Sequence, residues 1–187
     1  MKIQIKAITF ILILCLCGCT SIPKNVIIAP DILLVNDTNH NKQTQLDVVD
    51  MRTANHIVQI LQEGEAATLI SAQESIENTI KKTLTKQWVK QGLTISDGAA
   101  NVINVSIEKA IINVAQETMA YKVKTDIVLK VTIENGSQTL TNTFSNSGTS
   151  DGPLKADIAV LERNFNHRLA TLLQQVLISK KITNFLK

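Results

Sequence analysis

The sequence predicts an α+β fold, in which an antiparallel β-sheet with a three-strand meander packs against two long amphipathic helices. Apolar residues recur at the helical period in two segments, one from Ile76 to Trp88 and one from Leu154 to Val176. Between these segments, apolar and polar residues alternate over long stretches, which is typical of strands with one buried face. The chain of 187 residues is long enough for one domain of ordinary size.

The N-terminus has the three parts of a secretory signal. Two lysines stand within its first residues, residues 8–16 are apolar apart from Thr9, and the small Gly18 directly precedes Cys19. The apolar run is too short to span a membrane. The stretch Leu16-Cys17-Gly18-Cys19 resembles the bacterial lipoprotein signal, in which the chain is cut between the last two residues and the cysteine receives lipid. An ordinary secretory signal with an incidental cysteine is the alternative.

This resemblance divides the chain into a cleaved signal peptide (1–18), a lipidated cysteine with a short tether (19–24) and a single α+β periplasmic domain (25–187). It implies that Cys19 carries a diacylglycerol and a further fatty acid such as palmitate, enough to hold the protein on a membrane. Thr20, not an aspartate, follows Cys19. Under the sorting rule of Gram-negative lipoproteins, this implies the periplasmic face of the outer membrane.

The composition of the mature domain limits its partners. Cys15 and Cys17 lie within the signal, so the domain is expected to fold without disulfides. Removing Lys2 and Lys6 from the 19 basic residues leaves 17, against 16 acidic residues. This balance argues against a nucleic-acid partner.

The first part of the domain is expected to contain strands and a loop. Residues 26–35 predict a buried strand interrupted at Pro30, which cannot donate to a ladder. The polar residues 36–45 predict a surface loop, and residues 46–50 predict a second strand. Residues 56–70 fit either a hairpin or a strand beside a loop.

The first helix is expected to begin at a capping box formed by Ser71 and Glu74 and to end before Gly92. Four apolar residues at intervals of four form its buried stripe: Ile76, Ile80, Leu84 and Trp88. Four lysines lie toward its C-terminal half: Lys81, Lys82, Lys86 and Lys90. A solvated face explains these lysines more simply than a site for a polyanion.

The meander is expected to follow this helix. Residues 102–107 predict its first strand, with a β-bulge near Ala110 where the apolar register shifts. Residues 121–134 predict the second strand. Asn135-Gly136 predicts a two-residue hairpin turn, so the strand through residues 139–144 should return antiparallel.

The second helix is expected after Asp151-Gly152-Pro153, with Pro153 in its first turn. Its apolar stripe from Leu154 to Val176 continues for about seven turns. Packing of this stripe on the sheet is a simpler explanation than a groove for a partner. Residues 182–186 predict a short terminal turn.

The sequence lacks the motifs of common enzyme and metal sites. Three histidines are far apart in the sequence: His40, His56 and His167. Because the only mature cysteine is expected to carry lipid, no cysteine is left as a metal ligand. Neither a metal nor another cofactor is therefore expected. No G-x-S-x-G motif or phosphate-binding glycine loop occurs. Asp47 with Asp50, or Glu63 with Glu65, could supply paired carboxylates, but solvated loop acids are the commoner explanation.

Five features occur in a fixed order along the chain. They are the apolar strand after Cys19, Asp50-Met51-Arg52-Thr53, a helix followed by Lys90-Gln91-Gly92-Leu93, the strand pair from Asn104 to Asn135-Gly136, and the closing Ile182-Thr183-Asn184-Phe185-Leu186-Lys187. In this order they resemble the YajG family of bacterial outer-membrane lipoproteins. The resemblance implies an envelope location and an α+β fold, but no reaction and no catalytic residues.

Arg52 with Asp50 is the polar element that this resemblance singles out. An internal ion pair that fixes a loop is the simpler explanation, and recognition of a ligand is the alternative.

These observations favour a non-enzymatic, lipid-anchored domain that binds another envelope component, either a protein or peptidoglycan. The alternative is an enzyme acting on cell-wall fragments or lipids, in which carboxylates such as Asp50 or Glu63 come together only in the folded chain, and a pocket joining two such acids and Arg52 would favour it. A third hypothesis is a structural role, in which an exposed strand edge pairs with a second copy of the chain.

Overall fold

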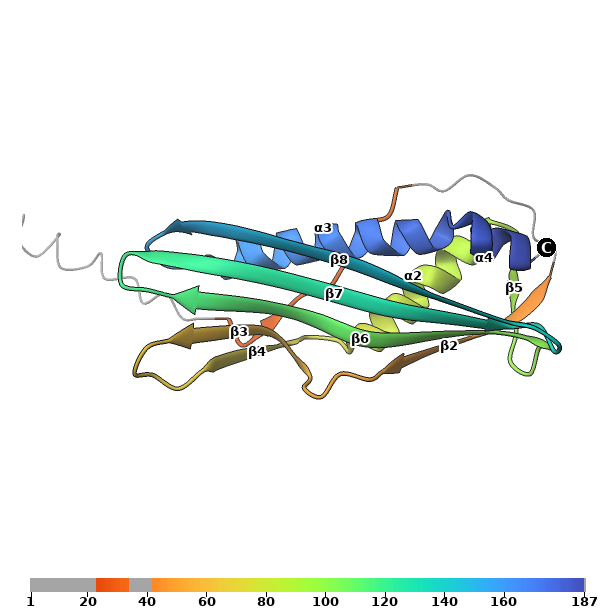
Figure 1. Ribbon diagram of the computed structural model, residues 1–187, viewed down its shortest axis with the longest axis horizontal. Coiled ribbons are helices and arrows are strands. Elements are labelled where there is room, and N and C mark those ends of the chain that lie inside the picture. Colours follow the sequence, from red (N-terminus) through yellow and green to blue (C-terminus); the bar gives the residue numbers. More distant parts are fainter. Residues whose placement is uncertain (1–22, 34–41, 187) are drawn as a thin grey trace, which may run out of the picture.

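The computed structural model describes residues 23–33 and 42–186 (Figure 1). The predicted lipoprotein signal and Cys19 lie outside the described residues, and so do His40 and most of the predicted 36–45 loop. The described strands are β1 (Asn25–Val26), β2 (Gln43–Asp50), β3 (His56–Gln62), β4 (Thr68–Ala72), β5 (Thr94–Ile95), β6 (Asn101–Gln116), β7 (Ala120–Glu134) and β8 (Thr139–Pro153). The described helices are α2 (Ile76–Lys90), α3 (Ile158–Leu177) and α4 (Lys180–Phe185).

All eight strands belong to one mixed sheet, so the prediction of a purely antiparallel sheet is wrong. Strands β6, β7 and β8 do form the predicted antiparallel meander. On its other edge, however, β6 pairs parallel with β2 and then, further along, parallel with β3. The physical reason is the connection: after the β3–β4 hairpin, α2 carries the chain across the sheet before β6 begins. A crossover of this kind returns a strand in the same direction as an earlier one.

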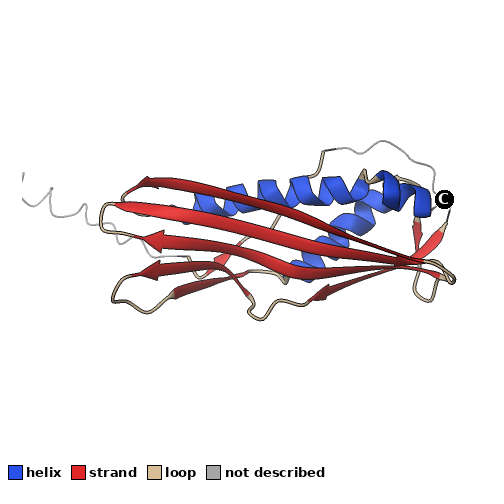
Figure 2. Cartoon of the chain, viewed as in Figure 1, coloured by secondary structure: helices blue, strands red, loops and turns tan. Residues whose placement is uncertain are grey.

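The helices lie on one face of the sheet and enclose the core against it (Figure 2). The prediction of two long amphipathic helices is supported only in part, because α2 has 15 residues and α3 has 20. Each buries one face. The buried apolar side chains of these faces include Ile76, Ile80, Leu84 and Trp88 from α2, and Leu161, Phe165, Leu169, Leu173 and Val176 from α3.

Both predicted helix starts are wrong, because Ser71 and Pro153 pair with neighbouring strands of the sheet. Ser71 belongs to β4, where it pairs with β1 and β3, and Ser75 caps α2 by accepting a hydrogen bond from the Asn78 amide. Pro153 is the last residue of β8. Asp157 caps α3, its carboxylate accepting a 2.8 Å hydrogen bond from the Ala159 amide.

The β7–β8 turn and the β-bulge of β6 lie close to their predicted positions but differ in detail. The β7–β8 turn is centred on Gly136 and Ser137, because the Asn135 amide already donates to Gln138 (3.1 Å). Gly136 takes the positive φ that the first central position of a two-residue hairpin requires. The register shift of β6 falls between Ile107 and Lys109, close to the predicted bulge.

The segment after the tether is not the long strand that the sequence predicts. Only Asn25 and Val26 form β1, and residues 27–29 then turn onto α3. The Ile27 amide donates to the Glu162 carboxylate (2.7 Å), and Asn166 bonds the backbone of both Ile27 and Ala29. Side chains of α3 therefore take the place of a neighbouring strand.

Phe165→Ala should lower the free energy of unfolding by about 3–5 kcal/mol, because it empties a fully buried site between α3 and the sheet. Urea unfolding can be followed through Trp88, the only tryptophan, which is buried on α2. Val89→Ala, at an exposed neighbour of this reporter, should change the free energy by no more than about 0.5 kcal/mol. Equal midpoints for the two variants would contradict the placement of α3.

Candidate functional site

The predicted Asp50–Arg52 element lies where β2 ends and β3 has not yet begun. Strand β6 continues past this gap, and its register shifts there, between Ile107 and Lys109. The Met51 amide still reaches the Ile107 carbonyl (3.0 Å), but ladder pairing with β6 resumes only at Val58 and Ile112. The junction therefore leaves backbone groups that neither β2 nor β3 pairs.

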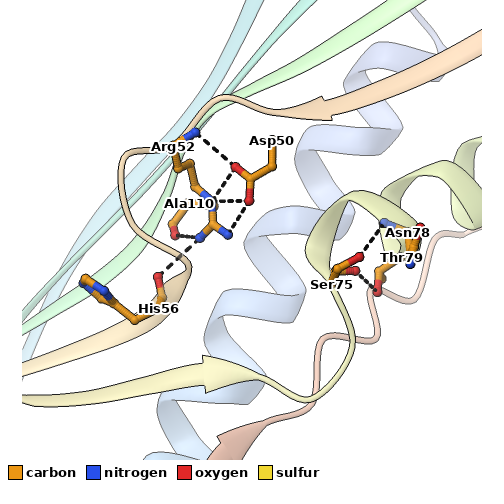
Figure 3. Close-up of polar contacts among 7 residues, drawn as sticks. All are labelled: Asp50, Arg52, His56, Ser75, Asn78, Thr79 and Ala110. Atoms are coloured by element: carbon orange, nitrogen blue, oxygen red, sulfur yellow. Dashed lines mark hydrogen bonds and ion pairs between the residues drawn. The ribbon is translucent and has the colours of Figure 1, made fainter.

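Arg52 fills this gap (Figure 3). Its Nη1 donates to the carbonyl oxygens of Ala110 (3.0 Å) and His56 (3.3 Å). Its Nε and Nη2 donate to the two carboxylate oxygens of Asp50, at 2.9 Å and 2.8 Å. The Arg52 amide also donates to Asp50 (3.1 Å). One guanidinium thus joins the end of β2, the start of β3 and the bulge of β6.

The Asp50–Arg52 ion pair is largely buried, and its two charges satisfy each other. The side chains of Arg52 and Asp50 are 7% and 15% exposed. Burial raises the pKa of Asp50, but the hydrogen bonds and the positive charge of Arg52 outweigh it, so the pKa lies below its usual value. Since the bidentate contact and the two carbonyls occupy most of the guanidinium donors, little of Arg52 is available to a ligand.

The imidazole of His56 is not part of this cluster. Figure 3 shows the ring pointing away from Arg52, which contacts only the His56 carbonyl. The ring Nε2 is buried without a hydrogen-bond partner among the residues that the structure describes. Within those residues, no group of three potential ligands could hold a metal ion.

The structure does not bring Asp50 and Glu63 together. Glu63 lines a cavity of about 540 Å³ with Glu117 and Lys155, and neither Asp50 nor Arg52 lines it. Asp50 lies opposite Ile107 of β6, and Gln62, next to Glu63, lies opposite Gln116, so nine residues of β6, roughly 30 Å, separate the two acids. Asp47 lies near Lys81 (3.8 Å). The arrangement required for the enzyme hypothesis, two acids beside Arg52, is therefore not formed.

A second candidate site, which the sequence analysis missed, is the free edge of β8. This strand pairs only with β7, in unbroken register over all 15 residues. At its two ends, Gln138 and Leu154 bond backbone groups of Asn135 and Met119, so the even-numbered residues face β7. The odd-numbered residues therefore direct their N–H and C=O groups to the free side.

The side chains of these odd-numbered residues are also exposed, on the sheet face without helices. Six of them bear a hydroxyl group: Thr139, Thr141, Thr143, Ser145, Ser147 and Thr149. The next is Asp151. The alternation of Thr or Ser was visible in the sequence. Its meaning was not, because only the sheet order shows that β8 has one neighbour.

One side chain of α3, that of Arg168, bonds backbone and side-chain groups in the middle of this edge. Arg168 donates to the Ser147 carbonyl (3.2 Å) and to the Asn146 side chain (3.1 Å). A Cβ at Gly148 would lie 2.0 Å from the Arg168 guanidinium, so glycine leaves room for this contact. The remaining free groups of β8 have no such partner among the contacts of the described residues.

A groove of about 420 Å³ crosses the same helix-free face at one end of the sheet. Leu61 of β3, Ala115 of β6, Lys122 and Lys124 of β7, and Thr149 of β8 line it. No described helix is long and apolar enough to cross a membrane. The predicted cleavage and lipidation site at Gly18 and Cys19 lies outside the described residues.

Arg52→Ala should lower the free energy of unfolding by about 3 kcal/mol, since it leaves Asp50 and the Ala110 carbonyl unpaired in a largely buried site. Arg52→Lys should recover only part of this loss, because an ammonium cannot make the bidentate contact. The matched control is Lys82→Ala, which breaks the exposed pair with Glu74 and should cost no more than about 0.5 kcal/mol. Equal losses at the two sites would contradict a structural Arg52.

The same pair predicts a pH dependence. Because the folded pKa of Asp50 is lowered, the unfolded chain binds the proton more readily, and the stabilisation is complete only above about pH 4. It should be lost as the pH falls further. Asp50→Asn should be less stable at neutral pH and should lose less stability on acidification. Part of the acid sensitivity should remain, since a hydrogen bond from Lys109 also lowers the pKa of Asp126.

The comparisons with known proteins identify the family and support the fold. A family model described as an uncharacterized lipoprotein, Lipoprotein_16, matches residues 32–187. Among solved structures, protein XCC0632 from Xanthomonas campestris is 10% identical, with a TM-score of 0.59 over 85% of this chain and 96% of that chain. At this identity the likeness shows the fold alone.

Rare lipoprotein B from Shewanella oneidensis is also similar, at 9% identity and a TM-score of 0.41, over 76% of this chain and 98% of that chain. No curated protein matches the sequence. Since the family model covers most of the chain, the resemblance described from the sequence is confirmed. The chain belongs to the YajG family of uncharacterized lipoproteins.

Proposed function

We propose that this lipoprotein is a non-enzymatic recognition domain, anchored by lipid on Cys19 to the periplasmic face of the outer membrane. Its partner is an envelope protein that adds an extended segment to the free edge of β8. The observation that carries the proposal is this edge, which is long, regular and almost uncharged.

The family and the length of the tether support the proposed anchor. Pro23, where the described chain begins, is four residues after Cys19, so the tether spans at most about 14 Å. Burial of two or more acyl chains is sufficient for stable attachment. Such a domain stays close to the membrane and meets partners that are themselves in the envelope.

The edge of β8 differs from the other sheet edges. Proteins protect free edges with short strands, lysines, prolines or bulges. Strands β1 and β5, at the other ends of the sheet, have two residues each. Strand β8 has 15 residues, one acidic residue and a single proline at its last position. Apart from the Ser147 carbonyl, which Arg168 binds, the described edge carries no such protection. An edge of this length is suited to strand addition, in which backbone hydrogen bonds supply affinity.

A protein partner fits this surface better than peptidoglycan does. Sugar rings are commonly bound on exposed aromatic side chains, whose faces present apolar surface. Every aromatic residue that the structure describes is buried or half-buried: Trp88, Tyr121, Phe144, Phe165 and Phe185. The surface beside the free edge instead carries hydroxyl groups, which suit the polar rim of a protein interface.

A photo-crosslinking amino acid at Thr143 or Ser145 should form adducts with one envelope protein in intact cells. The same group at Lys86, an exposed residue of α2, should form none, because α2 packs on β2, and β6 and β7 separate β2 from β8. Mass spectrometry of the membrane fraction identifies the adduct. Adducts from all three positions, or with peptidoglycan only, would contradict the proposal, and a self-adduct would make a second copy the partner.

Thr143→Pro should abolish the adduct formed from Ser145 without unfolding the domain. The Thr143 N–H points to the free side, so proline removes a donor for the added strand and none from the β7 ladder. Asn142→Pro is the matched control, since it removes a ladder donor and should destabilise the fold itself. Thermal unfolding distinguishes the two: only Asn142→Pro should shift the midpoint substantially.

A further inference from the structure

We propose that the end of the sheet formed by the β3–β4 and β6–β7 turns rests on the membrane, with Met119 and Leu154 in contact with lipid. The proposal rests on lipidation of Cys19, as proposed above, and adds an orientation and a contact surface. The lipid contact would fix how the β8 edge is presented.

The direction of the N-terminal chain selects this end. Strand β1 runs parallel to β4, with Asn25 opposite Ser71 and Val26 opposite Ala72. Followed backwards from Asn25, the chain therefore leads toward the start of β4 and the β3–β4 turn. It leads away from the opposite end of the sheet, where β6 begins.

The length of the tether fits the same end. Asn25 lies level with the start of β3, because both Asn25 and His56 pair with Ser71. From there to Gln62, the seven residues of β3 cover roughly 20 Å. Cys19 is six residues before Asn25, which also spans at most about 20 Å. An extended tether can bring the lipid level with the turns but not far beyond them, so the turns must lie near the membrane surface.

Apolar side chains are exposed at this end. Met119 and Leu154 are 70% and 60% exposed, and the Leu154 amide donates to the Met119 carbonyl (2.9 Å), so the two residues are neighbours. Leu154 has a φ of 63°, a left-handed conformation that is unfavourable for a leucine. Leu61, exposed in the adjoining groove, lies near the same end.

A buried glutamine holds this apolar tip rigid. The side-chain NH2 group of Gln116 has two N–H donors and lies within hydrogen-bond distance of three carbonyl oxygens, those of Glu117 (2.8 Å), Ala120 (3.1 Å) and Leu154 (2.6 Å). Its side-chain oxygen accepts from the Ala156 amide (3.3 Å). One side chain thus ties the β6–β7 turn to the β8–α3 connection and fixes Met119 beside Leu154.

The charges around the tip favour apolar contact with zwitterionic lipid over attraction to anionic headgroups. Acidic and basic residues occur together there: Glu63, Glu65, Glu117, Lys122 and Lys155. Lys122 is paired with Glu117 (3.3 Å). A mixed cluster of this kind lacks the excess of lysine and arginine that binds anionic membranes.

The test uses the full-length lipidated protein in nanodiscs of zwitterionic phospholipid. Because the mature domain has no free thiol, Met119→Cys, Leu154→Cys and Ile178→Cys each provide one labelling site for bimane. Ile178, at the end of α3, is similarly exposed (56%) but lies at the other end of the molecule (Figure 1). Trp88 emission confirms that each variant is folded.

Lipids carrying a spin-label quencher should remove most of the bimane fluorescence at positions 119 and 154 and none at position 178. Equal quenching at all three positions would mean that the domain lies flat, and no quenching would mean that the tip is free of lipid. Either result overturns the inference. Failure of the protein to enter nanodiscs, or absence of lipid on Cys19 by mass spectrometry, would instead contradict the proposed anchor.

Discussion

Strand β6 is longer than either strand that pairs with its second edge, and the rest of the structure depends on how this mismatch is resolved. β6 has 16 residues, whereas β2 has eight and β3 has seven. The chain covers one edge with two successive strands and must leave that edge between them. Arg52 supplies donors where the ladder is interrupted, and Asp50 balances its charge. A hydrophobic residue could not do this, because the carbonyls of Ala110 and His56 would remain unpaired.

The sequence predicts those elements whose signal is local. Alternation over residues 121–134 and the apolar stripe ending at Trp88 depend on neighbours within the same element, and the structure contains both. Local rules predict helix starts at Ser71 and Pro153, but these residues pair with neighbouring strands as parts of β4 and β8. The parallel pairing of β6 with β2 has no local signal, because it joins residues more than fifty positions apart.

The candidate sites show the same division. Asp50 and Arg52 are two residues apart, so their pairing could be expected from the sequence. The Ala110 carbonyl is 58 residues from Arg52, and only the bulge of β6 brings it into reach. The free edge of β8 could not be predicted either, since a strand is an edge only by its position in the sheet order.

The two proposed contacts constrain each other. Strand β8 begins at the β7–β8 turn and ends beside Met119, so its edge runs along the length of the sheet to the tip that we place on the membrane. With the tip on lipid, the hydroxyl-bearing positions from Thr139 to Thr149 extend away from the membrane surface. A strand of roughly 50 Å then presents free backbone groups at graded distances from the membrane. An envelope protein that is itself anchored nearby could pair with this edge without either partner leaving the membrane, and the shortness of the tether would favour that encounter by keeping the edge in a fixed orientation.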